Sequence, residues 1–215
     1  MTKEKTIQQY IDAIITMDIE TAKKSCEDAI TEGISPYKII QEGIIEAVSI
    51  IGEKFEKEEF FLAELIMGGE IIKQTMTILK PHIEGNSATG VRAKIVIGTA
   101  KGDLHDIGKN IVATFLNAEG FEVIDLGVDV SSEKFIEAVR NIKPNILAIS
   151  ALVSSTMVEV KKVMTALNEA NIRDQVKIIV GGAPISQTFV DNIGADAYAK
   201  DVIDGVKICK RWTEV

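Results

Sequence analysis

His105 is the residue of this chain best suited to metal or acid–base chemistry. It lies in AKGDLHDIGKN, residues 100–110, directly after the β-branched run KIVIG. The sequence holds only two histidines, and this one stands among two aspartates and two glycines. An imidazole ring binds transition metals and exchanges protons near neutral pH, and a neighbouring carboxylate can fix its orientation. The stretch is therefore the first candidate for a functional loop.

Four common kinds of site match this loop poorly. A phosphate-binding P-loop needs four residues between its first glycine and a Gly-Lys-Ser/Thr ending, whereas five residues separate Gly102 from Gly108 and the ending is GKN. A dinucleotide-binding GxGxxG does not follow the first expected strand. A phospho-acceptor receiver domain is expected to have an aspartate where the third strand ends in Ser150. A zinc site lacks supporting histidines or cysteines. The plain alternative is that His105 caps or decorates a helix start.

Short β-branched runs alternate with helical patterns from residue 93 onward. The expected strands are AKIVIG, FEVIDLG, PNILAIS, VKIIVGG and ADAYAK. The expected helices lie near residues 106–119, 132–142, 157–170, 186–193 and 201–212. Continuous apolar runs are typical of parallel strands buried on both faces. The alternation predicts a doubly wound, five-stranded parallel sheet with right-handed crossovers and the flavodoxin-like strand order 2-1-3-4-5.

The loops that follow three of these strands are expected to form one site. In a doubly wound sheet the ligand binds beyond the carboxyl ends of the strands, where the strand order reverses. For the order 2-1-3-4-5, this place lies between the first and third strands. The loops GTAKGDLHDIG, SALVSST and GGAPIS follow strands one, three and four. The fold would therefore bring His105 close to the other two loops.

The first 80 residues have helical periodicity throughout. Apolar residues recur at helical spacing in EKTIQQYIDAIITM. Asp18 is expected to cap a second helix, which ends near Gly33, and Ser35 with Pro36 opens a third. Short connections between these helices and a fourth one predict an antiparallel four-helix bundle.

A change of composition marks the boundary between two domains. The fourth helix, FFLAELIMGGEIIKQTMTILK, is expected to stop at Pro81. Residues 81–92, PHIEGNSATGVR, are polar and contain two glycines and a proline, which is typical of a linker. We therefore expect a helical domain at residues 1–80 and a sheet domain at residues 93–215.

The composition limits the cellular compartments and the kinds of partner to be expected. The net charge is −8, which argues against nucleic acid or an anionic membrane surface as the main partner. The start MTKEKTIQQY has no apolar signal core, and no apolar run approaches the roughly 18 residues that span a bilayer. We expect a cytosolic protein. Cys26 and Cys209 lie far apart and outside metal-spacing motifs, so both are expected to be packing residues.

The three loops together resemble the signature of cobalamin-binding domains that hold the cofactor base-off and His-on. DLHDIG supplies Asp-x-His-x-x-Gly, SAL supplies Ser-x-Leu some 45 residues later, and GG follows about 30 residues after that. The stretch GEKFEKEEFFLAELIMGGEIIKQTMTILKP is similar to the helical cap of methyl-carrying corrinoid domains, although Ala63 stands where proline is common. The resemblance covers nearly the whole chain. It extends to the corrinoid proteins of methylamine, methanol, methoxyarene and betaine methyltransferase systems and to the cobalamin module of methionine synthase.

The resemblance assigns roles to particular residues. It implies that His105 displaces the cofactor's dimethylbenzimidazole and becomes the lower axial ligand of cobalt. Asp103 would hold the other ring nitrogen, and Thr156 would complete a relay able to take up a proton when His105 leaves the metal. The implied cofactor-binding residues are Gly102, Asp103, Leu104, His105, Asp106, Gly108, Ser150, Leu152, Ser154, Thr156, Gly181, Gly182, Phe61, Leu65 and Met67.

Further roles concern the nucleotide tail and the methyl-bearing face. Gly181 and Gly182 would leave room for the displaced nucleotide tail, and Ser150 would donate a hydrogen bond to it. Gly108 would allow close approach near a helix start, and Asp106 is expected at that helix's N-cap. Apolar side chains of the helical domain would cover the methyl group and shield it from water, namely Phe61, Leu65 and Met67.

The resemblance implies a methyl carrier rather than a complete enzyme. Mutases with this signature need a large barrel domain, for which 215 residues leave no room. Light sensors carry a DNA-binding domain and a cap tryptophan, whereas the one tryptophan here is Trp212. The chain would shuttle a methyl group through Co(I) and methyl-Co(III) states of the cofactor.

The implied partners follow from this cycle. They are a substrate:corrinoid methyltransferase, a second methyltransferase acting on a folate, pterin or thiol, and a reductive activator. The linker at residues 81–92 would serve as the hinge for cap movement. The alternative function is a corrinoid-binding storage or regulatory module without methyl transfer. The sequence leaves the methyl donor open.

Overall fold

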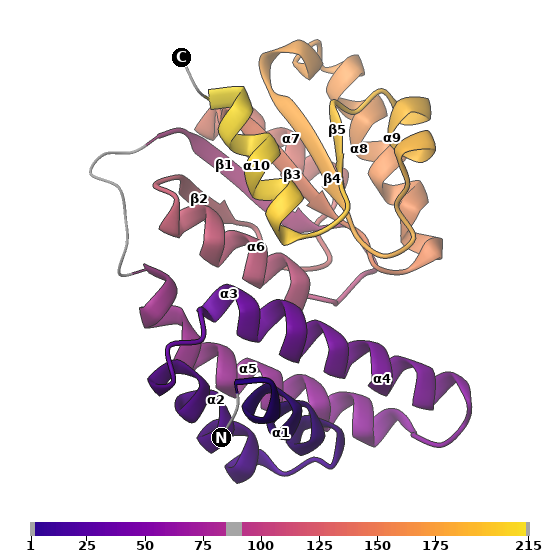
Figure 1. Ribbon diagram of the computed structural model, residues 1–215. Helices are drawn as coiled ribbons and strands as arrows, with labels where there is room; N and C mark the ends of the chain where they lie inside the picture. Colours follow the sequence, from indigo (N-terminus) through magenta and orange to yellow (C-terminus); the bar gives the residue numbers. More distant parts are fainter. Residues whose placement is uncertain (1–2, 85–91, 214–215) are drawn as a thin grey trace. The chain divides into compact units, whose positions relative to one another are not determined.

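The chain folds into two compact units, a helical unit followed by an α/β unit (Figure 1). The computed structural model describes residues 3–84 and 92–213. Residues 85–91, which make up most of the predicted linker and hinge, lie outside the described residues. Within the described part of the chain, no helix has the length and apolar character needed to cross a membrane.

The N-terminal unit is built from four helical segments, as predicted. The third segment is long and continuous, because an α-helical start, a turn of π-helix and a second α-helical stretch follow one another directly. The caps form as expected: the Asp18 side chain accepts from Thr21 N, and Ser35 Oγ accepts from Lys38 N at 3.3 Å. The elements are α1 (Lys3–Ile15), α2 (Ile19–Thr31), α3 (Pro36–Ile39), η1 (Ile40–Ile44), α4 (Ile45–Glu56) and α5 (Leu62–Glu84).

Tyr10 lies at the centre of this helical unit. Its side chain is fully buried, and its hydroxyl donates to Thr75 Oγ1 at 2.7 Å, which connects α1 to α5. Burial raises the pKa of Tyr10, so the phenol stays neutral. The π-helical turn η1 places Gly43 against the ring, where a Cβ atom would lie 2.9 Å from Tyr10 Cδ1. A residue larger than glycine at this position would displace the ring.

Helix α5 continues through Pro81 to Glu84, and the expected stop at Pro81 is therefore wrong. Proline removes one backbone donor, but Pro81 and Thr77, whose carbonyl loses its partner, are both exposed and can be hydrated. The helical stripe of core residues also extends past the proline, since both Leu79 and Ile83 are buried. Packing of this stripe outweighs one lost hydrogen bond in the last turn.

The C-terminal unit contains a five-stranded, wholly parallel sheet with the predicted order β2-β1-β3-β4-β5. Its strands are β1 (Lys94–Thr99), β2 (Glu122–Asp125), β3 (Ile146–Ser150), β4 (Lys177–Gly181) and β5 (Ala197–Ala199). Its helices are α6 (Ile107–Ala118), α7 (Ser132–Ile142), η2 (Ser154–Thr156), α8 (Met157–Glu169), η3 (Arg173–Gln175), α9 (Gln187–Ile193) and α10 (Val202–Thr213). The flavodoxin-like fold class is confirmed.

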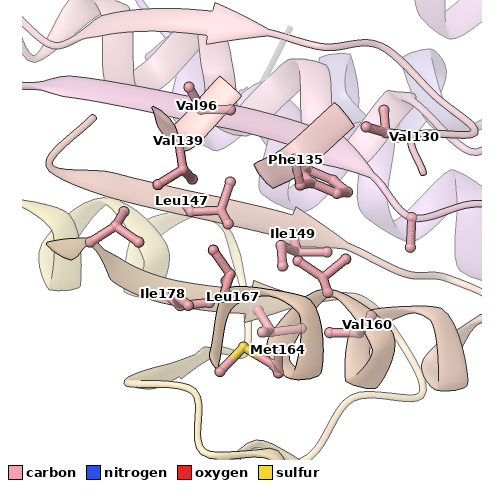
Figure 2. Close-up of a cluster of buried hydrophobic side chains, with 14 of the residues drawn as sticks. Val96, Val130, Phe135, Val139, Leu147, Ile149, Val160, Met164, Leu167 and Ile178 are labelled. Carbon is pink, nitrogen blue, oxygen red and sulfur yellow. The ribbon is translucent and has the colours of Figure 1, made fainter. Parts of the chain in front are cut away.

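Alternate residues of the buried strands enter two separate cores, one on each face of the sheet. On one face, Val96 and Leu147 pack with side chains of α7 and α8, among them Phe135 and Leu167 (Figure 2). On the other face, Ile95 and Ile146 are joined by apolar side chains of α6 and α10. This double burial explains why the strands are apolar at successive positions rather than at every second one.

The two cysteines are buried and unpaired in the described part of the chain, as expected. Cys26 belongs to α2 and Cys209 to α10. Burial raises the pKa of each thiol to about 12. Both therefore act as small core side chains rather than as reactive thiols.

Candidate functional site

The carboxyl ends of β1, β3 and β4 lie side by side. Thr99 is in register with Ser150, and Ser150 is in register with Gly181. Backbone hydrogen bonds continue this order into the loops, since Ala100 N donates to Ser150 O at 2.9 Å and Ala151 N donates to Gly181 O at 3.0 Å. The sheet therefore brings together the loops that carry Asp-x-His-x-x-Gly, Ser-x-Leu and Gly-Gly.

The carboxylate of Asp103 is the centre of this loop cluster. Asp103 is only 1% exposed, yet both oxygens are surrounded by donors. Oδ1 accepts from His105 N at 3.0 Å and from His105 Nδ1 at 2.7 Å. Oδ2 accepts from Leu152 N at 2.6 Å, Val153 N at 3.3 Å and Thr156 Oγ1 at 3.1 Å. One buried carboxylate thus links the loop after β1 to the loop after β3.

These donors keep Asp103 ionised. Burial alone would raise the pKa of Asp103, but the hydrogen bonds from Leu152, His105 and Val153 outweigh burial and lower the pKa below its usual value. An ionised carboxylate only accepts hydrogen bonds, so Nδ1 of His105 must carry the proton in this contact. Nε2 is consequently the ring nitrogen that can offer a lone pair to a metal.

His105 presents its ring outward from a fixed backbone. The His105 side chain is 59% exposed, whereas the Asp103 side chain that holds it is fully buried. The backbone is fixed as well, because Thr99 Oγ1 donates to His105 O at 3.0 Å. The hydrogen bond that the His105 ring makes within the described residues is at Nδ1, and Nε2 takes no part in it. The arrangement offers an oriented imidazole ring whose Nε2 is left for another partner.

Thr156 lies where the sequence placed it, at the far side of Asp103. It is 5% exposed and ends the short helix η2. Its hydroxyl lies 3.1 Å from Asp103 Oδ2 and 2.7 Å from the carbonyl oxygen of Val153, so one proton serves two acceptors. Hydrogen bonds therefore connect Thr156 to Asp103 and Asp103 to His105 without a break.

The glycines of the site are explained in different ways. Gly182 has φ +132°, and a Cβ there would lie 1.9 Å from Ala151 O, so it permits the close approach of two loops. A Cβ at Gly181 would be 3.4 Å from Ala199 O, which is ordinary contact. At Gly108, in the first turn of α6, a Cβ would meet no described atom within 4 Å. Gly108 thus borders open space, whereas Gly182 has a steric role in the fold itself.

Other predicted site residues lie on the same loops and at the starts of the helices that follow them. Leu104 is 72% exposed and Leu152 is 41% exposed, and both are apolar. Ser154 begins η2 and is exposed, and the side chain of Ser150 is partly buried. Asp106 occupies the N-cap position of α6, but its carboxylate accepts from Asn110 Nδ2 at 3.0 Å rather than from the backbone.

The predicted cap residues lie at the start of α5. Phe61 is 68% exposed and Met67 is 44% exposed, while Leu65 is partly buried. Phe61 N donates to Glu64 Oε2 at 2.8 Å, which fixes the start of the helix. These residues belong to the helical unit, and their function as cover for a cofactor stays a prediction.

Several residues of the site were missed by sequence reasoning. Val153 and Thr99 act through a backbone amide and a hydroxyl, and neither forms a motif. Lys109 is buried and contacts Asp125 Oδ2 at 2.5 Å, which ties the start of α6 to the end of β2. Asp129 accepts from Gly102 N at 2.7 Å. Of these residues, only Lys109 could have been singled out from the sequence, because its charged side chain directly follows Gly108 of the motif.

Two family comparisons agree with this site. Residues 93–207 match a family described as B12 binding domain, and residues 6–80 match a second family of the same description. The chain therefore belongs to the B12-binding domain family, and its cofactor is of the cobalamin class.

Individual relatives narrow the class to corrinoid proteins. The chain is 42% identical over 206 residues to trimethylamine corrinoid protein 1 of Methanosarcina acetivorans, covering 95% of each chain. It superposes on the monomethylamine corrinoid protein of Methanosarcina barkeri with TM-score 0.92 at 34% identity, covering 98% of this chain and 99% of that one. The methanol:cobalamin methyltransferase complex MtaBC of Methanosarcina barkeri matches with TM-score 0.54 at 29% identity, over 98% and 80% of the chains. The predicted resemblance to corrinoid proteins is confirmed.

The residues at the loop cluster fit a cobalamin. A cobalt ion takes imidazole nitrogen as a ligand, and His105 offers Nε2 on an exposed ring whose other nitrogen is held by Asp103. Exposed apolar side chains suited to a large, mostly apolar macrocycle lie on the two loops that Asp103 links, namely Leu104, Leu152 and Val153. The open space at Gly108 is compatible with a bulky group beside the helix start.

Proposed function

We propose that this protein is the methyl carrier of a methylamine methyltransferase system and that His105 would ligate the cobalt of its cobalamin in place of the cofactor's own base. The observation that carries the second part is the contact between His105 Nδ1 and the buried carboxylate of Asp103 at 2.7 Å. It fixes the tautomer, so that the nitrogen facing outward is the one able to bind a metal. When bound, the cofactor supplies a cobalt centre that accepts a methyl group and gives it up again.

The protein's own residues orient the ring and manage its proton. Asp103 has both oxygens filled by donors, so a proton taken up when the ring is not ligated resides on Nε2 of His105. Asp103 stays ionised and keeps the ring in position for religation. Thr156 anchors the other oxygen of Asp103, which prevents the carboxylate from rotating away from the histidine.

The partners follow from the carrier function. A substrate:corrinoid methyltransferase would load the methyl group, and the similarity to trimethylamine and monomethylamine corrinoid proteins favours one of these amines as its source. A second methyltransferase would pass the group to a thiol, folate or pterin, and a reductive activator would restore oxidised cofactor. The similarity to MtaBC, a methanol:cobalamin methyltransferase complex, supports direct binding to the first partner.

The axial role of His105 is tested by electron paramagnetic resonance of protein loaded with cob(II)alamin. The wild-type protein is expected to show hyperfine splitting from one axial nitrogen, and ¹⁵N-histidine labelling should change that splitting. His105→Ala should lose the response to ¹⁵N-histidine, because any nitrogen that then binds cobalt belongs to the cofactor's own base. The other histidine, His82 on α5, is exposed and provides the control, since His82→Ala should leave the spectrum unchanged. A wild-type splitting that ¹⁵N-histidine labelling leaves unchanged refutes the axial role.

The methyl-carrier role is tested by supplying purified methyltransferases. Reduced, cobalamin-loaded protein is mixed with a trimethylamine- or a monomethylamine-specific corrinoid methyltransferase and the matching amine. Methylation is expected with one of these pairs and is followed by the absorbance change of the cofactor. A methanol-specific enzyme with methanol is the comparison. Tight cobalamin binding without methylation by any of them would favour a storage or regulatory module instead.

A further inference from the structure

The loop after β2 is hydrogen-bonded to the end of β1, from which the loop that carries His105 continues. Thr99 N donates to Gly127 O at 3.0 Å, and Val130 N donates to Thr99 O at 2.9 Å. These backbone bonds extend the pairing of the sheet beyond the ends of β1 and β2. The two loops therefore run side by side in the direction of the histidine.

Asp129 makes two contacts further along this pair of loops. Its Oδ1 accepts from Gly102 N at 2.7 Å, and its own N–H donates to Asp103 O at 3.0 Å. The first contact is a short, charge-assisted hydrogen bond. Together the two contacts hold Gly102 N and Asp103 O, which lie on either side of the Gly102–Asp103 peptide unit.

Within the loop, this segment is held by the hydrogen bond from Asp103 N to Ala100 O at 3.1 Å, and Asp129 adds contacts from outside the loop. Gly102 has φ +80°, a conformation that glycine adopts freely and leaves just as freely. Asp129 itself has φ +53°, in the left-handed region that aspartate and asparagine tolerate better than most residues. Asp129 thus satisfies a backbone requirement and a hydrogen-bonding requirement at one position. An alanine there would meet neither.

We infer that Asp129 is a positioning residue for the His105–Asp103 pair. It acts on the backbone next to Asp103 and leaves the Asp103 carboxylate to the donors of His105, Leu152 and Thr156. By holding the backbone on both sides of the Gly102–Asp103 peptide, Asp129 narrows the range of orientations of the His105 ring and favours the ligating one. The inference rests on the proposed axial role of His105.

Two substitutions separate the hydrogen bond from the backbone conformation. Asp129→Gly keeps the left-handed conformation and the backbone N–H but removes the acceptor for Gly102 N. Asp129→Asn keeps the conformation and an acceptor oxygen and removes only the charge. Because one hydrogen bond is lost, Asp129→Gly should lower the ratio of His-on to His-off cob(II)alamin roughly fivefold. Asp129→Asn should stay within about twofold of the wild type.

Two measurements decide the inference. Electron paramagnetic resonance gives the His-on fraction of the loaded protein, and amide hydrogen exchange of Gly102 is measured by NMR on the cofactor-free protein. Asp129→Gly should accelerate Gly102 exchange and reduce the axial nitrogen signal, with both restored in Asp129→Asn. If Asp129→Gly has the wild-type exchange rate at Gly102 and the wild-type His-on fraction, the inference about Asp129 is overturned and the proposed role of His105 is left intact.

The remaining outcomes are equally decisive. A wild-type protein without any axial nitrogen signal overturns the proposed role of His105 and this inference with it. If Asp129→Gly does not fold, the Gly102 amide of the wild-type protein remains measurable, and an unprotected amide there shows that Asp129 holds nothing. Comparable loss in Asp129→Asn and Asp129→Gly would point to net charge rather than to the contact with Gly102, and would also overturn the inference.

Discussion

Replacing Asp103 by asparagine changes one oxygen to an NH₂ group and leaves the shape of the side chain intact. In the wild-type protein Oδ1 faces two donors of His105, and Oδ2 faces the amides of Leu152 and Val153 and the hydroxyl of Thr156. Whichever way the amide of Asp103→Asn is turned, its NH₂ group meets two N–H donors. The substitution therefore cannot be accommodated by a simple flip.

The cost follows from the hydrogen bonds lost. Hydrogen bonds to a charged group contribute about 1.5–3 kcal/mol each, and two are lost in either orientation. Leu152, Val153 and the His105 ring are partly exposed, so water can reach the freed donors and the lower end of this range applies. We expect Asp103→Asn to reduce the free energy of unfolding by about 3 kcal/mol. If the NH₂ group faces His105, the ring can regain one of these two hydrogen bonds only by accepting at Nδ1 with its proton on Nε2, which removes the free nitrogen.

The assay uses the single tryptophan. Trp212 packs against the core of the C-terminal unit, so its fluorescence during urea unfolding reports on the unit that contains the site. Asp106→Asn is the matched control, because Asp106 lies in the same loop with one side-chain contact, to Asn110. It should change stability by less than about 0.5 kcal/mol. A loss of the same small size in Asp103→Asn, with the axial nitrogen signal retained, would refute the reasoning.

Acid provides a second measurement of the same group. The pKa of Asp103 is lower in the folded protein than in the unfolded chain, where aspartate titrates near about 3.9. Its stabilising contribution is therefore fully present above that value and is lost as the pH falls through the lowered folded pKa. In Asp103→Asn this part of the acid dependence should be absent. Equal slopes of stability against pH below about pH 4 in the two proteins would contradict the assignment.

Further predictions concern glycines and a buried ion pair. Gly182→Ala should cost more than about 3 kcal/mol in urea unfolding, because its Cβ would collide with Ala151 O, whereas a wild-type midpoint would contradict the steric argument. Gly108→Ala should keep the stability or raise it by up to about 1 kcal/mol, yet weaken cobalamin binding in a titration. Unchanged binding would exclude a contact between the cofactor and Gly108. Asp125→Ala should destabilise more than Lys109→Met in urea unfolding. It leaves a 2% exposed lysine side chain with the neutral Asn110 oxygen but without a carboxylate, whereas Lys109→Met leaves a carboxylate that is 37% exposed; the opposite order would refute this.

Sequence reasoning predicted the fold because its signals are local. Continuous apolar runs, helical periodicity and caps such as Asp18 depend on neighbours a few residues away, and the strand order followed from the class of sheet. The one element that ended in the wrong place was α5, where the buried side chains of Leu79 and Ile83 outweighed the local signal of Pro81. The bounds of the two domains, and the cover that the helical unit would provide, stay predictions.

The contact between His105 and Asp103 was within reach of the sequence, because the two residues are two positions apart in one loop. Only the tertiary structure decided what holds Asp103 and the loop itself. Leu152 is 49 residues from Asp103, and Asp129 is 27 residues from Gly102. Such contacts exist because β1 pairs in a particular register with β2 and β3, which sets the loops beyond the strand ends side by side. The motif determined which ring could bind a metal, and the sheet register determined which groups orient it, since hydrogen bonds between distant loops follow from how the strands align rather than from local sequence.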